Sequence, residues 1–230
     1  MRALNYFLGV IISLSIILIL LLTSVQNVAL RDYEFYRSQY IENNVYANIA
    51  ISEDDLMDVT EQLINYMNGK RDDISVITTI DGEEKEFFNQ REKDHMVDVR
   101  NLITGGKKLR IMLIGIVVIL LALMKWLKAP IVKAVSKSSV VTIAAVIVGS
   151  GILGYIISRN FSQAFTIFHE ILFTNELWIL DYSTDRLLNM VPEVFFINIA
   201  IKIGVTFLFM VMVYFIISVL SVLIERKKII

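Results

Sequence analysis

Four long apolar stretches dominate the hydropathy pattern of the chain, and each is close to the roughly 20 residues that a helix needs to cross a bilayer core. They run over residues 7–25, 109–127, 138–158 and 203–224. The second stretch has a short charge-free centre, so Arg110 and Lys125 must snorkel to reach the headgroups. The pattern therefore predicts four membrane-spanning helices.

Basic residues predict the orientation of these four spans. Cations occur at Arg2, in the connection 125–137 and in the tail 226–228, which all lie on one side of the membrane. These short segments contain a single acid, so the positive-inside rule places both termini in the cytoplasm. Residues 7–25 are long for a signal-peptide core and are followed by a weak cleavage signal, so we interpret them as a retained anchor.

The segment between the first two spans, residues 27–106, has about twice as many acidic as basic residues, which suits an extracytoplasmic cap. Within it, "SEDDLMDVTEQLINYMNG" starts with a candidate N-cap, Ser52, and spaces its apolar residues as an amphipathic helix. The stretch "SVITTIDGEEKEFF" surrounds the turn Asp81-Gly82 with two short runs and predicts a β-hairpin.

Taken together, the pattern predicts an all-α integral membrane protein with a small extracytoplasmic cap made of one helix and one hairpin. We expect a single membrane domain over residues 1–230, with residues 159–200 as a second extracytoplasmic segment, re-entrant or interfacial. The apolar fraction of 56% and the mean hydropathy of +0.63 exclude an ordinary soluble domain. No basic stripe of the nucleic-acid-binding kind is present, and the sequence gives no oligomeric state.

The chain contains only two histidines, His95 before the second span and His169 after the third. Two crossings separate them, so a four-span topology returns both to the outer interface. On a helix, Asp98 shares a face with His95 and can hold one ring nitrogen, which would select the tautomer. We expect Trp178 and the neighbouring phenylalanines to lie at headgroup depth and to shape a pocket for an amphiphile.

Other interpretations of the histidines remain open at this point. Histidine and tryptophan are common at membrane interfaces without any catalytic role. Zinc ligation by the histidines with Asp98, Glu92 or Glu170 is a weaker possibility, because the chain has no H-E-x-x-H spacing and no cysteine. We therefore predict neither a metal nor a cofactor, and keep a metal-dependent membrane hydrolase and a non-catalytic sensor or assembly factor as alternatives.

Two motifs, taken in order, carry a resemblance to a known family. "REKDHMVDVR" before the second span and "FHEILFTNELWILDYSTDRLLNMVPEVFF" between the third and fourth resemble the lipoprotein intramolecular transacylase family, Lit, of low-GC Gram-positive bacteria. The likeness extends over essentially the whole chain. It implies a multi-pass enzyme of the bacterial plasma membrane, with its active site at the outer leaflet.

The resemblance also implies a reaction and its partners. An acyl chain would move from the sn-2 ester of the diacylglyceryl group on a lipoprotein's N-terminal cysteine to the α-amino group of that cysteine. The partners would be a diacylated bacterial lipoprotein and membrane lipids, and the product an N-acyl, S-monoacylglyceryl lipoprotein. We expect substrate-binding residues in and around the two motifs: Trp178, Phe168, Phe173, Asp185 and Arg100.

The spacing of carboxylates suggests how the histidines would divide the work. Because Asp98 can support His95, we predict that His95 is the general base. No carboxylate lies one turn beyond His169, so His169 would stabilise the oxyanion or protonate the glyceryl oxygen, while Glu170 would point away.

Without cysteine in the chain, direct aminolysis is simpler than an acyl-enzyme, although a seryl intermediate at Ser162 or Ser183 stays possible. Lys202 lies at the outer end of the fourth span, and we expect it to snorkel towards lipid phosphates.

Overall fold

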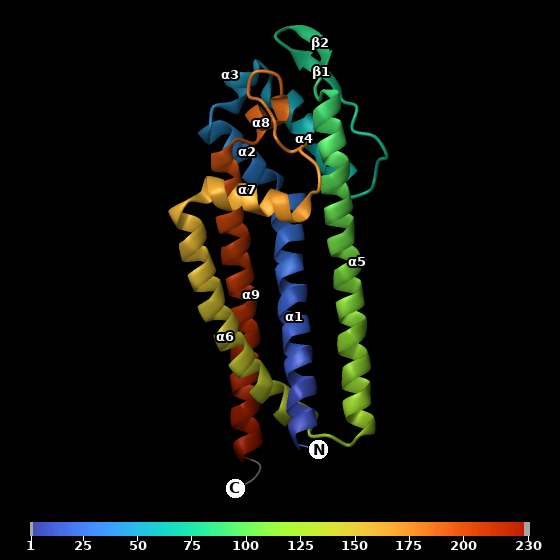
Figure 1. Cartoon of the computed structure of the whole chain (residues 1–230), viewed down its shortest axis with the longest axis vertical. Coiled ribbons are helices and arrows are strands. Elements are labelled where there is room, and N and C mark those ends of the chain that lie inside the picture. Colours follow the sequence, from blue (N-terminus) through green and yellow to red (C-terminus); the bar gives the residue numbers. More distant parts are fainter. Residues whose placement is uncertain (1, 228–230) are drawn as a thin grey trace. The chain divides into compact units, whose positions relative to one another are not determined.

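The structure is a computed structural model that describes residues 2–227, and four of its helices are long and apolar enough to cross a membrane (Figure 1). They are α1 (Arg2–Arg31), α5 (Gln90–Trp126), α6 (Ile131–Arg159) and α9 (Glu193–Lys227). Each covers one of the predicted apolar stretches, although α5 ends one residue before the predicted stretch does, so the four-span architecture is confirmed. Lys228, a cation of the predicted cytoplasmic tail, lies outside the described residues.

The chain divides into two compact units. Three of the boundaries between them fall within the helices α1, α5 and α9, and the fourth falls between α6 and Asn160. The apolar unit comprises the residues up to Val25, the segment Lys107–Arg159 and the chain from Ile203 onward. The polar unit comprises Gln26–Gly106 and Asn160–Lys202. The segments predicted as the cap and as the second extracytoplasmic segment, which are far apart in the sequence, therefore fold together.

Polar side chains join three helices inside the apolar unit. Ser139 on α6 lies 2.8 Å from the Ser13 hydroxyl on α1 and 2.5 Å from the Tyr214 hydroxyl on α9, measured between oxygens. Close approach of α1 and α6 depends on Gly9, because a Cβ there would lie 2.7 Å from the Ser138 Oγ. Hydroxyl bonds and small residues are the contacts expected where lipid removes the hydrophobic drive for helix association.

The polar unit holds seven short elements. They are α2 (Tyr33–Glu42), α3 (Val45–Ile49), α4 (Glu53–Met67), β1 (Ile77–Ile80), β2 (Glu83–Glu86), α7 (Phe161–Leu172) and α8 (Arg186–Met190). The predicted cap helix is α4, where the Ser52 hydroxyl accepts a hydrogen bond from the Asp55 N–H at 3.1 Å. The predicted hairpin is β1–β2, which pair antiparallel across a turn with positive φ at both Asp81 and Gly82.

One aromatic-rich core holds the polar unit together. Tyr40 of α2, Leu56 of α4 and Phe87 after the hairpin are completely or almost completely buried, and Met190 of α8 and Phe195 of α9 belong to the same cluster. The Tyr40 hydroxyl is satisfied by the Thr60 hydroxyl at 2.9 Å. Met96 of α5 belongs to this core, so the core holds the part of α5 that carries His95.

Candidate functional site

The polar unit brings the two histidines side by side. His95 lies in the second turn of α5, before the apolar stretch of that helix, and His169 lies in the last turn of α7. Their ring centroids are 6.2 Å apart, and the side chains are only 7% and 8% exposed. The two histidines, which were expected at one interface, therefore lie close enough together to act on one reacting group.

Helix α7 buries a polar residue and exposes apolar ones, which is the reverse of the distribution in a soluble protein. His169 is its one fully buried residue, whereas Ile167, Phe168 and Ile171 are 46%, 52% and 75% exposed. The helix starts directly after α6, with Asn160 as its N-cap. Such a helix, apolar outside and polar at its buried face, is typical of an element that lies in a lipid interface.

Hydrogen bonding selects the tautomer of His169. Its Nδ1 lies 2.7 Å from the carbonyl oxygen of Phe165, one turn earlier on α7. Because a carbonyl can only accept, Nδ1 must carry the proton. In the neutral ring the lone pair is therefore on Nε2.

Aromatic rings enclose the histidine pair. Trp178 stacks on His169 with centroids 4.9 Å apart and planes inclined by 28°. Phe173, the C-cap residue of α7, lies 5.5 Å from the His95 ring and 5.6 Å from the His169 ring. Phe168 meets His169 edge-on at 5.4 Å. Three of the predicted substrate-binding residues thus surround the imidazoles.

His95 lacks the support that the sequence suggested. Its Nδ1 is buried and has no hydrogen-bond partner among the described residues. The Asp98 carboxylate instead accepts a hydrogen bond from the Asn175 side chain at 2.8 Å. The expected hydrogen bond between His95 and Asp98 is therefore wrong, because a distant residue that follows α7 in the chain competes successfully for the carboxylate.

Burial controls the charge of both rings. Desolvation, together with the nearby His169 ring, lowers the pKa of His95 to about 4, and the Asp98 charge offsets this only in part. Desolvation also lowers the pKa of His169, although the hydrogen bond to Phe165 acts in the opposite direction. Both imidazoles are consequently neutral at pH 7, and the pair resists taking up two protons.

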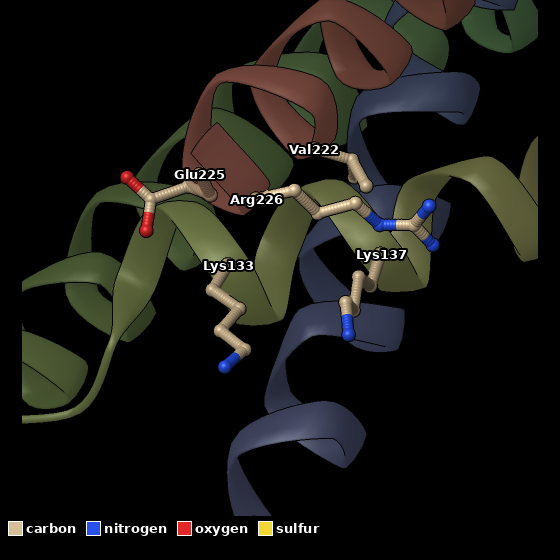
Figure 2. Close-up of a pocket in the computed structure, with 5 residues that line it drawn as sticks. All are labelled: Lys133, Lys137, Val222, Glu225 and Arg226. Atoms are coloured by element: carbon tan, nitrogen blue, oxygen red, sulfur yellow. The ribbon is translucent and has the colours of Figure 1, made fainter. Parts of the chain in front are cut away.

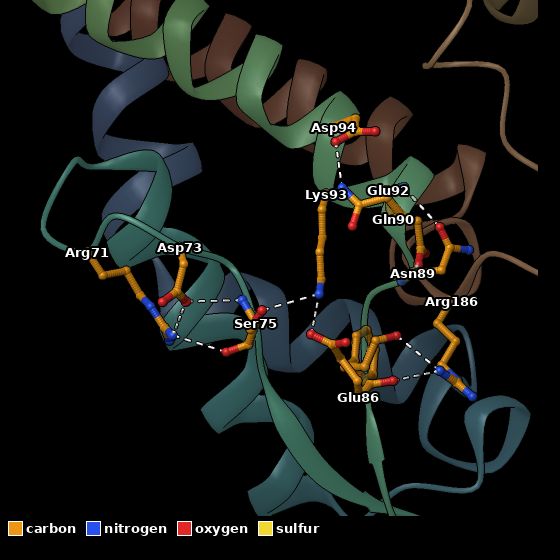
Figure 3. A network of polar contacts seen from close by, with 11 residues as sticks. Arg71, Asp73, Ser75, Glu86, Asn89, Gln90, Glu92, Lys93, Asp94 and Arg186 are labelled. Carbon is orange, nitrogen blue, oxygen red and sulfur yellow. Dashed lines mark hydrogen bonds and ion pairs between the residues drawn. The ribbon is translucent and has the colours of Figure 1, made fainter.

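A capping box fixes the start of α5 just ahead of His95 (Figure 3). The Glu92 carboxylate accepts the Asn89 N–H at 2.7 Å, and the Asn89 side-chain oxygen accepts the Glu92 N–H at 3.0 Å. The same carboxylate accepts the N–H of Leu187 in α8. Glu92, considered above as a metal ligand, is therefore a structural residue, and the N-x-x-E spacing of "NQRE" was the signal for it.

Two other predicted substrate-binding residues lie in different surroundings. The Arg100 guanidinium is bonded to Asp72 at 3.2 Å and lies over the Tyr66 ring at 4.7 Å, so its contacts hold the cap together. Asp185 is buried and accepts a hydrogen bond from Asn89 at 2.6 Å. Asp185 also lines an open hollow of about 540 Å³ beside Arg91. That these two residues bind substrate stays a prediction.

Other side chains considered from the sequence have partners away from the imidazoles. The hydroxyls of Ser162 and Ser183 donate to the carboxylates of Glu193 and Asp181, each at 2.7 Å. Glu170 is exposed, as expected for a residue pointing away from the pair. Within residues 2–227, no cluster of three or more histidine, cysteine or acidic side chains could hold a metal ion.

Lys202, which was expected to snorkel towards lipid phosphates, has a partner within the protein. Its ammonium group forms an ion pair with Asp32 at 2.6 Å and lies 4.8 Å from the Phe35 ring centroid. Asp32 is also the N-cap of α2. Lys202 therefore ties α9 to the start of α2 within the polar unit.

Comparisons of the sequence and of the structure with known proteins find the same family. A family model described as lipoprotein intramolecular transacylase Lit matches residues 10–196. The in meso structure of the membrane-integral lipoprotein intramolecular transacylase Lit from Bacillus cereus superposes with a TM-score of 0.75 at 20% identity, covering 99% of this chain and 100% of that one.

Two variants of that Bacillus cereus protein, in which a histidine is replaced by arginine or by alanine, each give a TM-score of 0.72 at 19% identity. They cover 98% of this chain and 95% and 96% of their own. At such identities the likeness shows a shared fold. A search of curated proteins gave no match.

The charge state of the pair can be measured directly, because the chain has only two histidines. In ¹⁵N-histidine NMR spectra of the purified protein, we expect His95 to titrate near pH 4 and His169 below 6.5. The His169→Ala variant assigns the signals and should raise the pKa of His95, because it removes the neighbouring ring. Titration of either ring at or above pH 6.5 in the unaltered protein would contradict this.

Proposed function

The chain belongs to the lipoprotein intramolecular transacylase family, Lit, and we propose that the paired imidazoles of His95 and His169 perform its acyl transfer. The enzyme is an acyltransferase whose substrate is a lipoprotein. It moves the sn-2 acyl chain of the diacylglyceryl-cysteine to the α-amino group of the same cysteine. The approach of two buried, neutral imidazoles to 6.2 Å is the observation that carries the proposed roles.

His169 is the general base in this proposal. Its Nδ1–H is held by the Phe165 carbonyl, which leaves the Nε2 lone pair to accept a proton from the substrate. Stacking against Trp178 restricts the ring. The roles are thus the reverse of those inferred from the sequence, because that inference relied on a hydrogen bond from His95 to Asp98.

His95 acts as the hydrogen-bond donor. Its buried Nδ1 has no partner among the described residues, and such a group is costly unless a ligand satisfies it. We assign it to the carbonyl oxygen of the reacting ester, which becomes an oxyanion on attack. Because this nitrogen is buried, a neighbouring side chain must move for the ester to reach it, and Phe173 packs on both rings.

The proposed step is direct aminolysis with one proton in transit. The cysteine amine, with an ordinary pKa near roughly 8, attacks the sn-2 carbonyl carbon as His169 Nε2 takes its proton. A C–N bond forms, and the carbonyl oxygen carries the negative charge opposite His95. When the C–O bond to glycerol breaks, the His169 imidazolium returns its proton to the glyceryl oxygen. An amide and a free hydroxyl result, and the enzyme is restored.

Neutrality of the pair supports this division of roles. A base must start unprotonated, and burial keeps His169 neutral at pH 7. When His169 accepts the proton, its charge disfavours a second charge on His95. His95 therefore stays neutral and keeps its donor available, while intramolecular proximity of amine and ester lowers the entropy cost of the reaction.

The site belongs at the outer leaflet in this proposal. Helix α7 starts one residue after α6 ends, and its exposed Ile167, Phe168 and Ile171 suit the acyl region of a leaflet. The cations at the other ends of the spans favour a cytoplasmic position for both termini. The substrate's acyl chains would then lie beside α7, with its ester at the depth of the histidines.

Replacement of either histidine tests the catalytic roles. With a diacylated lipopeptide and purified protein in detergent, we expect His169→Ala to lower the rate about 10²–10⁴-fold, the usual contribution of a general base. His95→Ala should lower it about 10²-fold or more through the lost oxyanion donor. Mass spectrometry of the lipopeptide N-terminus measures N-acylation.

Two matched variants serve as controls in the same assay. Glu170→Gln alters the exposed neighbour of His169 and should leave the rate nearly unchanged. Asp98→Asn should also have only a small effect, because the carboxylate does not bond to His95 and an asparagine oxygen can still accept the hydrogen bond from Asn175. Substantial N-acylation by both histidine variants would refute the histidine mechanism.

The proposed sidedness is testable because the chain has no cysteine. We expect a cysteine in place of exposed Glu170 to react with a membrane-impermeant maleimide in intact cells. A cysteine in place of Lys128, in the connection between α5 and α6, should react only after permeabilisation. Labelling in the opposite sense, with both variants present in the membrane at normal abundance, would contradict the proposed orientation.

A further inference from the structure

Basic side chains of α6 and α9 line a small hollow in the apolar unit (Figure 2). Lys133 and Lys137 lie one turn apart near the start of α6, and Arg226 lies in the last turn of α9. Val222 forms an apolar part of the lining, and Glu225 is its only acid. Figure 2 shows the Glu225 carboxylate directed away from the Arg226 guanidinium.

The positions of the two lysines on α6 are electrostatically unfavourable. Like charges spaced by four residues repel each other along a helix. Lys133 also lies in the first turn of α6, where the helix dipole disfavours a cation. Neither lysine forms an ion pair with a residue of the chain between 2 and 227. An anion bound between them would therefore offset this repulsion.

An anion in this position would have several attractive partners. It would meet two ammonium groups, one guanidinium and the positive end of the α6 dipole. The hollow, with about 80 Å³ of space, has room for a group of the size of a phosphate.

We propose that Lys133, Lys137 and Arg226 bind the phosphate group of an anionic phospholipid. Both helices are membrane spans, and all three cations lie near the span ends, at the depth of lipid headgroups. Basic pockets between transmembrane helices are common sites for anionic headgroups. Exposed apolar residues such as Val132 and Val141 on α6 and Leu223 on α9 provide surface for the attached acyl chains.

Native mass spectrometry of the delipidated full chain, titrated with phosphatidylglycerol, tests this proposal. We expect Lys133→Gln/Lys137→Gln to weaken phosphatidylglycerol binding by about fivefold for each lysine removed. The matched control is Lys125→Gln/Lys128→Gln, which removes the same charge from the end of α5 and the connection after it, outside the hollow. The control should bind like the unaltered chain, and phosphatidylcholine should bind weakly to all three proteins.

The possible outcomes separate this site from general attraction and from a site for free phosphate. Equal loss in both double variants, or equal binding of phosphatidylcholine and phosphatidylglycerol by the unaltered chain, would overturn the proposal. Displacement of the lipid by millimolar inorganic phosphate would assign the site to the free ion and would also overturn it. N-acylation of a lipopeptide in detergent should be unchanged in both double variants, which verifies that they are folded.

Discussion

Desolvation of two neighbouring imidazoles is the constraint on which the proposed chemistry depends. His95 and His169 share an aromatic enclosure in which a charged ring is poorly solvated, and the pKa of each is lowered. Both rings are then neutral in the resting enzyme. A neutral pair provides one acceptor nitrogen and one donor nitrogen without any further charged group. In water the same two side chains would be partly protonated near neutral pH and would lose this asymmetry.

The fold maintains this constraint through contacts that are distant in sequence. The Glu92 carboxylate caps the start of α5 by accepting the Asn89 N–H, and it also accepts the N–H of Leu187. Asp98, about one turn after His95 on α5, accepts a hydrogen bond from Asn175, which lies in the segment between Phe173 and Trp178. The aromatic cover is thus attached to the helix that carries His95. Helix α7 completes the enclosure by burying its histidine and exposing its apolar residues, which is favourable where lipid replaces water.

The sequence predicted the features that depend on neighbouring residues, but not the contacts between residues that are distant in the chain. The four spans followed from the long apolar stretches. The α4 helix followed from its apolar spacing and the N-cap Ser52, and the β-hairpin followed from the turn Asp81-Gly82. Counting membrane crossings predicted that His95 and His169 share one interface, whereas their close approach depends on the tertiary fold. The role of Asp98 was not predictable, because helical spacing showed that it could reach His95, whereas only the tertiary fold brings Asn175 to it. The ion pair of Lys202 with Asp32 was missed for the same reason, since it joins residues from opposite ends of the chain.

The central claim is that a substrate occupies the free nitrogens of both imidazoles at once. The most direct test is ¹⁵N NMR of the two histidines with a lipopeptide whose sn-2 ester is replaced by an amide, which keeps the carbonyl oxygen but resists transfer. The claim predicts that the Nε2 signal of His169 and the Nδ1 signal of His95 both shift as the lipopeptide binds, and that a phospholipid with the same acyl chains shifts neither. Saturating lipopeptide binding with both signals unchanged would contradict it.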